Sequence, residues 1–469
     1  MENNVKSVLI TLVVVFNLFF LSSASAVNWL TLQGVTDSPY PLVWGFIQPA
    51  YFKTEGTTLP EGNPWAGQKA VSNVIQPDQS SSQVFQIQRA RLGVRGALPE
   101  NDKISYFLLA EYGNNGITQP GGGAGKVTLT DATVTFTQIR GAKVRVGQMK
   151  VPMSEEVYQG IVAFNYINLT NIANQQLIER PFWTDGKANC TVGTPPGPTN
   201  DLYLRYCNGD AQTQFRSTAV AARDIGIQIF DSFKNESWEY SYALLIGQGG
   251  ANKDNRNDSL DNTVYLSAEK IFGGHRALRK GYKLYAWRTS GERTIYDSET
   301  LAAGGRSLEA AERKYDRTLG GIGGTYFDGK YRFWAEYIKV DGMIFSGTTF
   351  GALPGSVSNN GAVVAQFRTE PEGKGDGGYL DFGYRITKDI ELDIRYDWYN
   401  RVTNLQPTDE FKFETWTLGA QYFFTETTKA IVNYEKRDAE AVGYPSGSII
   451  SETAGTVDDR ISAQLFIFF

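Results

Sequence analysis

The sequence predicts an all-β transmembrane protein, a closed antiparallel barrel of about 16 strands. Apolar and polar residues alternate along most of the chain after residue 26, as they do in strands with two unlike faces. The connections between these strands are alternately short and long, which is typical of outer-membrane barrels. Aromatic residues make up 13% of the chain, which suits the aromatic girdles of such barrels.

The composition excludes several other classes of protein. Aromatic and β-branched residues are abundant and the net charge is only −5, so the chain is not disordered. With 2 Cys and 1 His, we expect no Cys/His metal site and no cofactor. A pI near 5.3 argues against nucleic-acid binding. The sequence has one long apolar run, which excludes a bundle of membrane helices.

That apolar run lies at the N-terminus and predicts an export signal. Lys6 supplies a positive charge, residues 8–21 are mostly apolar, and residues 24–26 are the small residues that signal peptidase reads. We therefore expect residues 1–26 to be a signal peptide and residues 27–469 to be the barrel domain. A transmembrane anchor is the alternative, but the run is shorter than the ~20 residues that a spanning helix needs.

The strand template fits segments along the whole chain after the signal. In one of them, the apolar residues Leu392, Ile394 and Tyr396 alternate with Asp393, Arg395 and Asp397. Many segments approach the ~9–11 residues that cross a bilayer as a tilted strand. The segments lie at 43–53, 84–97, 103–113, 126–138, 143–150, 223–230, 237–247, 262–271, 281–290, 315–327, 330–340, 376–386, 390–399, 412–423, 429–437 and 459–469.

The lengths of the connections favour a membrane barrel over a soluble sandwich. Every second connection is short, for example Asp328-Gly329, whereas intervening ones such as 54–83 and 341–375 are long and polar. Short periplasmic turns and long extracellular loops explain this alternation. A barrel this wide cannot fill its interior with side chains, so its polar face lines water and its apolar face meets lipid. The predicted location is the outer membrane of a Gram-negative bacterium.

The second strand carries three arginines, Arg89, Arg91 and Arg95, on one face. On the lipid face each would cost ~2–4 kcal/mol at the membrane midplane, so we expect all three to point into the lumen. They form either an electropositive strip that attracts anions or ordinary wall charges paired with carboxylates. Phe85 and Ile87 share the parity of Arg89, which indicates a bulge or a loop contact near this point.

The fifth strand adds basic residues to the predicted lumen. Lys143 and Arg145 alternate with apolar valines, and Lys150 ends the strand. The connection that follows, 151–222, is far longer than an ordinary loop, and loops of this length are usually functional or disordered. In a wide barrel such a loop can fold inward and narrow the lumen.

This long loop has the only helical character outside the signal. Ser154 followed by Glu155 and Glu156 is typical of an N-cap with acidic residues in the first helical turn. If the loop folds inward, Glu155, Glu156 and Arg180 lie near the narrowest point and face the arginine strip. The alternative is that the acidic residues only cap a loop helix.

The cysteines and the single histidine are also interpreted from their positions. Cys190 and Cys207 lie in one polar segment of the long loop, where an oxidising compartment favours a disulfide over two free thiols. His275 lies in a short turn, away from any predicted nucleophile, so we interpret it as a turn residue. We therefore expect no catalytic residue and no enzyme activity.

Several of these motifs together resemble the phosphate-selective porin O and P family. They are Gln88-Arg89-Ala90-Arg91 with Gly93 and Gly96, Asp131-Ala132-Thr133-Val134, Val146-Gly147-Gln148-Met149-Lys150-Val151-Pro152 and Glu179-Arg180, all within residues 84–183. The resemblance implies a trimeric, 16-stranded outer-membrane porin whose third loop folds inward and whose basic residues draw anions through. Here Gln88-Arg89 stands where the family has two arginines.

The predicted function is the passive diffusion of small hydrophilic solutes and ions. The selectivity stays open between an anion or phosphate preference and general diffusion, and a barrel whose long outer loops serve adhesion is a further alternative. A TonB-dependent transporter is excluded, because the chain is too short for a plug and about 22 strands. The pore-lining candidates are Arg89, Arg91, Arg95, Lys143, Arg145, Lys150, Glu155, Glu156 and Arg180.

Overall fold

The protein is described by a computed structural model. The described residues are 28–32, 36, 38–55, 58–61, 66–67, 70–72, 83–113, 127–178, 222–249, 259–274, 279–297, 311–346, 356–358, 368–403 and 409–469. The predicted signal peptide, Arg180, Cys190, Cys207 and His275 lie outside them.

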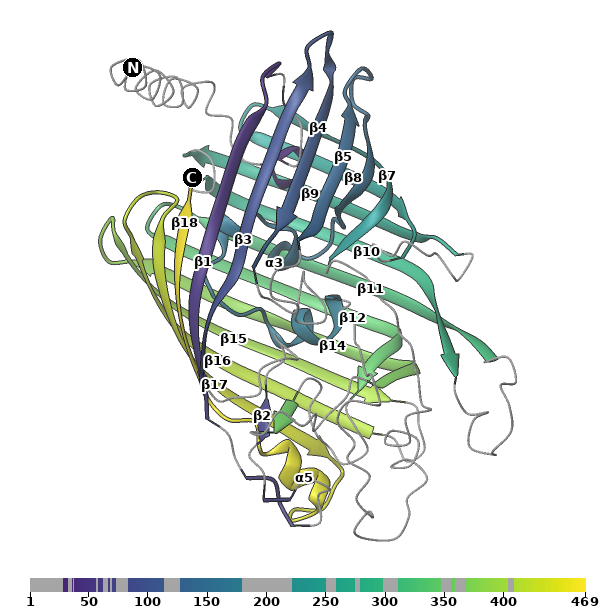
Figure 1. Cartoon of the computed structure of the whole chain (residues 1–469), viewed down its shortest axis with the longest axis vertical. Coiled ribbons are helices and arrows are strands. Elements are labelled where there is room, and N and C mark those ends of the chain that lie inside the picture. The colour runs from purple at the N-terminus through teal and green to yellow at the C-terminus, as the bar shows by residue number, and fades with distance from the viewer. Residues whose placement is uncertain are drawn as a thin grey trace, which may run out of the picture.

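Sixteen antiparallel strands of the described chain close into a barrel (Figure 1), as the sequence predicts. Each strand pairs with the next one along the chain, and the first pairs with the last. They are β1 (Leu42–Thr54), β3 (Gln83–Leu98), β4 (Asn101–Glu111), β5 (Thr128–Phe136), β6 (Lys143–Lys150), β7 (Arg223–Asn235), β8 (Trp238–Gly247), β9 (Asp261–Gly273), β10 (Lys280–Asp297), β11 (Ala311–Phe327), β12 (Tyr331–Ser346), β14 (Arg368–Arg385), β15 (Ile390–Thr403), β16 (Asp409–Phe423), β17 (Lys429–Val442) and β18 (Arg460–Phe468).

A few short elements lie outside the barrel wall. The strands β2 (Ala70–Ser72) and β13 (Ser356–Ser358) pair with each other as a separate small sheet. The helix α5 (Ile449–Ala454) lies in the connection between β17 and β18. In the described residues, no helix is both long and apolar enough to cross a membrane.

Several strands are longer than predicted, and the extra length lies at the end with the long loops. β10 runs to Asp297 where the alternation ends at residue 290, and β14 begins at Arg368 where it begins at residue 376. Beyond the bilayer both faces of a strand meet water, so apolar alternation disappears although the backbone pairing continues.

Burial follows the inside-out pattern expected of a membrane barrel. Apolar side chains of the outer face are exposed, for example Ile227 at 52% and Leu418 at 54%. Polar side chains of the inner face, such as Gln228 and Thr417, are buried. An exposed apolar belt around the whole barrel can only be stable against lipid.

A β-bulge in β3 explains why Phe85, Ile87 and Arg89, which are spaced two residues apart, do not all face the same side. In the pairing of β1 with β3, Gln48 lies opposite Arg89 and Pro49 lies opposite Ile87, so Gln88 is the extra residue. The bulge changes the facing, because Phe85 and Ile87 are exposed on the outside whereas Arg89 and Arg91 are buried on the inside. Pro49 fits here because it has no N–H group for a ladder hydrogen bond.

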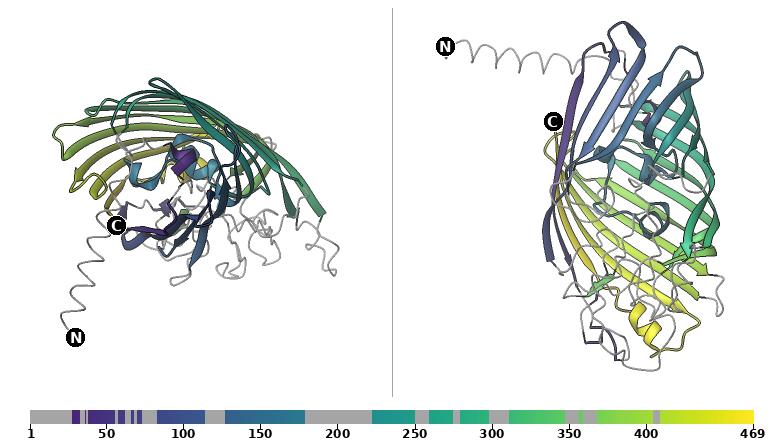
Figure 2. Two further views of the ribbon diagram at one scale, coloured as in Figure 1. Left: turned by 90° about the horizontal axis from the view of Figure 1, so that it is seen from above. Right: turned by 45° about the vertical axis from the view of Figure 1, so that its right-hand side comes forward.

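The described part of the long connection after β6, residues 151–178, lies against the inner face of the barrel. It contains α3 (Glu155–Tyr158), η2 (Ile161–Ala163) and η3 (Ala173–Leu177), and Figures 1 and 2 show α3 within the ring of strands. Hydrogen bonds join residues 154–171 to inward-facing side chains of β12, β14, β15 and β17. Gln176 donates to the Met343 carbonyl oxygen of β12 at 2.9 Å. Residues 179–221 lie outside the described residues, so the inward path of the whole loop stays a prediction.

Candidate pore constriction

The short helix α3 is held at both ends by the barrel wall. At its start, Ser154 has a φ of 37° and its hydroxyl donates to Glu336 Oε2 at 2.8 Å instead of capping the helix. Ser154 stands at the N-cap position but its side chain makes no capping hydrogen bond, so that part of the prediction is wrong. Glu155 and Glu156 do lie in the first turn, as predicted. At its end, Lys150 Nζ donates to the carbonyl oxygens of Val157 at 3.2 Å and Gln159 at 2.8 Å.

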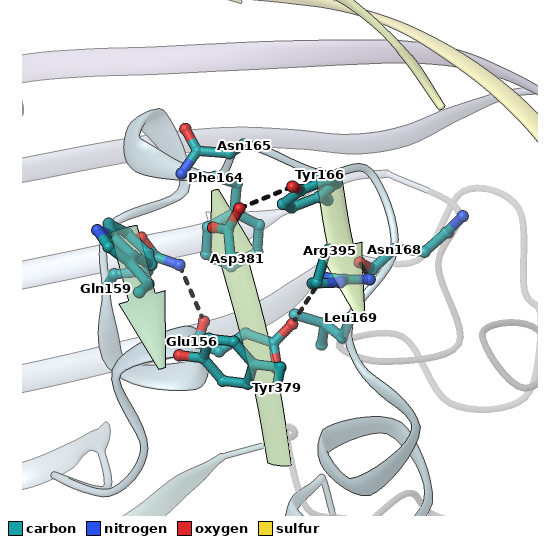
Figure 3. Close-up of a pocket in the computed structure, with 11 residues that line it drawn as sticks. Glu156, Gln159, Phe164, Asn165, Tyr166, Asn168, Leu169, Tyr379, Asp381 and Arg395 are labelled. Atoms are coloured by element: carbon teal, nitrogen blue, oxygen red, sulfur yellow. Dashed lines mark hydrogen bonds and ion pairs between the residues drawn. The ribbon is translucent and has the colours of Figure 1, made fainter. Parts of the chain in front are cut away.

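Glu156 joins the loop to the far wall. Its carboxylate accepts hydrogen bonds from Thr170 N at 2.9 Å and Thr170 Oγ1 at 2.6 Å, and lies 3.3 Å from Arg395 Nη1 of β15 (Figure 3). Burial raises the pKa of Glu156, and the Arg395 charge opposes that rise. Glu156 is thus a buried, paired carboxylate at the point where the loop meets β15.

Glu155 makes different contacts from its neighbour. It accepts a hydrogen bond from Trp29 Nε1 at 2.9 Å and forms an ion pair with Lys283 of β10. The two acids therefore pair with Lys283 and Arg395, whereas the sequence suggested that they face the arginines of β3. The reason is the direction of the loop, which crosses the lumen from β6 toward β10 and β15.

The rest of the described loop is bound along the same wall. Tyr166 donates to Asp381 at 2.7 Å, Asn168 donates to Glu435 at 2.6 Å, and Asn171 Nδ2 donates to Asp397 at 2.8 Å. A small pocket remains between the loop and the strands β12, β14 and β15. Figure 3 shows the residues that line it, which are Glu156, Gln159, Phe164, Asn165, Tyr166, Asn168, Leu169, Trp334, Tyr379, Asp381 and Arg395.

The wall beneath the loop carries paired charges that the sequence analysis did not single out. Arg332 forms ion pairs with Asp381 and Asp393, and with Glu391 at 3.1 Å. On the neighbouring strands, Arg460 lies 2.6 Å from Glu435. The alternation of Asp393, Arg395 and Asp397 placed such charges on one face, but sequence alone does not show which cation pairs with which acid.

A second group of charges lies on β3, β6 and β7. We call Arg89, Arg91, Lys150 and Arg223 the basic cluster, because these four buried cations interact electrostatically with one another. Arg91 pairs with Glu111 at 2.7 Å and Arg223 pairs with Asp131 at 3.2 Å.

The other two members of the cluster have neutral partners. Arg89 donates to the amide oxygen of Gln48 at 3.1 Å and lies over the Phe164 ring at 5.9 Å. Lys150 donates to the backbone carbonyls at the end of α3. Positive charge therefore exceeds the negative charge of the two paired carboxylates, Glu111 and Asp131.

The remaining predicted pore residues lie in three different settings. Arg95 is half-buried on β3. Lys143 forms an ion pair with Asp231. Arg145 is fully buried and donates to the Leu30 carbonyl oxygen at 2.8 Å and to Gln228 at 2.9 Å. No group of metal-ligating side chains occurs among the described residues.

The comparisons with known proteins agree with this architecture. Residues 61–191 match the family model described as phosphate-selective porin O and P. In this segment and in its closed barrel, the chain is similar to outer-membrane porins. The match covers all of residues 84–183, where the sequence motifs resemble that family, and it confirms the resemblance there. No curated protein matches the chain.

Solved structures give the same fold. The outer-membrane channel DcaP of Acinetobacter baumannii has a TM-score of 0.50 at 11% identity, over 93% of this porin and 99% of that chain. An anion-selective porin from Comamonas acidovorans has a TM-score of 0.47 at 12% identity, over 92% and 99% of the chains. A trimer form of OmpT from Vibrio cholerae has a TM-score of 0.47 at 13% identity, over 92% and 100%. These likenesses concern the fold; the family match at residues 61–191 and the closed 16-stranded barrel together support a passive diffusion channel for small solutes.

Proposed function

We propose that this porin prefers anions, and that the preference comes from the fixed charges of the basic cluster and not from a saturable phosphate site. The observation that carries the proposal is the excess of positive charge at Arg89, Arg91, Lys150 and Arg223. Two of these four residues, Arg89 and Arg91, are among the three arginines of β3 that the sequence predicts to point into the lumen.

The cluster acts through its field because its side chains are covered. Each of the four residues is at most 8% exposed. Charges just beneath the surface of a water-filled channel raise the local concentration of counter-ions without binding them directly. Such a field favours anions broadly and weakens as salt screens it.

A specific phosphate site needs several donors that converge on one exposed position. Arg91 and Arg223 already donate to carboxylates, and Lys150 donates to three backbone carbonyls. These donors are directed at the protein itself. We therefore propose broad anion preference, although the family that matches residues 61–191 is described as phosphate-selective.

The test is the reversal potential of single channels in a salt gradient. The variant Arg89→Glu with Arg91→Glu should lose the anion preference or become cation-preferring, because it replaces two positive charges with two negative ones. The control is Lys388→Glu, in the exposed turn between β14 and β15, which should leave the potential unchanged. An unaltered anion preference in the double variant would contradict the proposal.

Three further proposals follow from the sequence and the family resemblance. Export would involve cleavage after Ala26, which N-terminal sequencing of the secreted chain tests. Cys190 and Cys207 would form a disulfide, which thiol labelling before and after reduction tests. The porin would assemble as a homotrimer, as the resemblance implies, and the mass of the detergent-solubilised protein tests this.

A further inference from the structure

A short N-terminal helix, α2 (Trp29–Leu32), lies inside the barrel (Figure 2). Arg145 Nη2 of β6 donates to its Leu30 carbonyl oxygen at 2.8 Å. Trp29 Nε1 donates to Glu155 Oε1 at 2.9 Å. Just before the helix, Asn28 Nδ2 donates to Ser241 Oγ of β8 at 2.8 Å. The segment is thus bonded to two wall strands and to the loop helix α3.

Packing supports the same position. Leu30 is 1% exposed and belongs to the apolar cluster that includes Val157 of α3 and Phe230 of β7. The ring of Trp29 approaches Gly160 so closely that a Cβ atom at Gly160 would lie 2.9 Å from Trp29 Cζ3. Leu30 and Trp29 therefore pack between the barrel wall and the loop that carries α3.

The segment lies in the half of the lumen that carries the short turns. Its wall partner Arg145 lies near the start of β6, and Ser241 lies near the start of β8, both close to short connections. The chain then returns to the barrel rim, where the Ser38 carbonyl oxygen accepts from Ala97 N at 2.7 Å. Short turns mark the periplasmic end of such barrels, so the segment enters from that end.

We propose that residues 28–32 are a built-in element of the pore constriction. They narrow the periplasmic half of the lumen between β6, β8 and α3, and they bind Arg145, which would otherwise face the channel water. The first effect reduces the conductance of the open pore. The second removes one positive charge from the set that acts on passing anions, and this part rests on the proposed anion preference.

The charge argument follows from the contacts of Arg145. Its guanidinium donates to Leu30 O, Gln228 Oε1 and Thr135 Oγ1, and it lies 4.3 Å from the Phe230 ring centroid. Removal of the segment deletes the carbonyl partner and uncovers the cation. A newly hydrated arginine in the lumen wall then strengthens the field that attracts anions.

The first experiment deletes residues 28–32 and records single-channel currents. We expect the conductance to rise by at least about 1.5-fold, because pore conductance follows the open cross-section. We also expect a stronger anion preference, which Arg145→Met in the deleted chain should abolish while the conductance stays high. Unchanged conductance in a correctly folded deletion variant would overturn the proposal.

The two readouts separate this inference from the proposed function. If the full-length porin shows no anion preference, the proposed function fails, yet the conductance of the deletion variant still tests the constriction. Slower migration of the variant on gels after heating shows that it has folded as a barrel.

A second variant keeps the chain complete. Gly160 has a φ of −69° and a ψ of 144°, which any residue adopts, so Gly160→Ala changes only the space beside Trp29. The added methyl group should displace the Trp29 ring and raise the conductance. The matched control is Gly320→Ala on β11, where the nearest atom to a new Cβ lies at 3.5 Å. Equal conductance in the two variants would count against the constriction.

Discussion

Glu156 of the inward loop lies 3.3 Å from Arg395 of β15, and both side chains are buried. This ion pair joins α3 to β15, which lies on the side of the barrel opposite β6. Arg395 also donates to the Asn168 carbonyl oxygen at 3.1 Å and lies 4.4 Å from the Tyr166 ring centroid. One arginine of the wall therefore fixes two separate stretches of the loop.

The single variant Arg395→Met should destabilise the barrel by about 3 kcal/mol, because it leaves the buried Glu156 carboxylate without its cation. Open-channel noise should rise as the loop loosens. Denaturant unfolding followed by tryptophan fluorescence measures the loss. In the double variant with Glu156→Gln the cost should shrink, since residue 156 then carries no charge that needs Arg395; an additive cost would contradict the pairing.

The anion preference should increase as the pH falls. Burial raises the pKa of Glu156, so this carboxylate takes up a proton at a higher pH than an ordinary glutamate, and the lumen then gains positive charge. The free energy of unfolding should also increase as the pH falls. The stabilising contribution of Glu156 is complete below its ordinary pKa and is lost as the pH rises through the raised pKa.

Reversal potentials recorded between about pH 7 and pH 5 measure this effect. Glu156→Gln should show a larger anion preference at pH 7 and a weaker dependence on pH. If the variant and the natural porin respond equally to pH, another carboxylate controls the selectivity.

Lys150→Met should loosen α3 without disturbing the wall. The substitution keeps the length of the side chain but removes three hydrogen bonds to the carbonyl oxygens of Val157, Tyr158 and Gln159. Charged donors of this kind are worth about 1.5–3 kcal/mol each, and partial rehydration of the carbonyls lowers the net loss. Protease cleavage within residues 151–178 should become faster, whereas the exposed Lys53→Met should behave like the natural porin.

Deletion of Gln88 should prevent normal assembly. The bulge at Gln88 lets Phe85 and Ile87 face outward while Arg89 and Arg91 face inward. Without the extra residue, one of these two pairs must turn to the wrong face, and a one-residue shift reverses every side chain beyond it. The yield of heat-modifiable barrel should fall sharply for the deletion and stay normal for Gln88→Ala. Equal yields would show that the bulge is dispensable.

Strand alternation predicted the barrel well because lipid on one side and water on the other impose opposite chemistry on adjacent residues. The parity conflict at Phe85, Ile87 and Arg89 predicted a bulge or a loop contact near this point, and the pairing of β1 with β3 shows a bulge there. The ends of β10 and β14 were missed, since those segments leave the bilayer and lose the alternation.

The site was less predictable from sequence. Composition and spacing placed Arg89, Arg91 and Glu156 in the lumen, but the partner of each depends on how strands distant in sequence meet. The contact of Arg145 with Leu30 joins residues 115 positions apart, one of them a backbone carbonyl with no sequence signature. Nothing in the short segment around Trp29 indicated that it would enter the barrel.

The most direct test of the anion preference is the zero-current potential of the natural porin and of Arg89→Glu with Arg91→Glu, measured in the same salt gradient and then with added phosphate. We predict anion preference in the natural porin, its loss or reversal in the variant, and no block of current by phosphate in either. The same potential in both proteins would contradict the role of the basic cluster, and block by low phosphate would show a specific phosphate site instead.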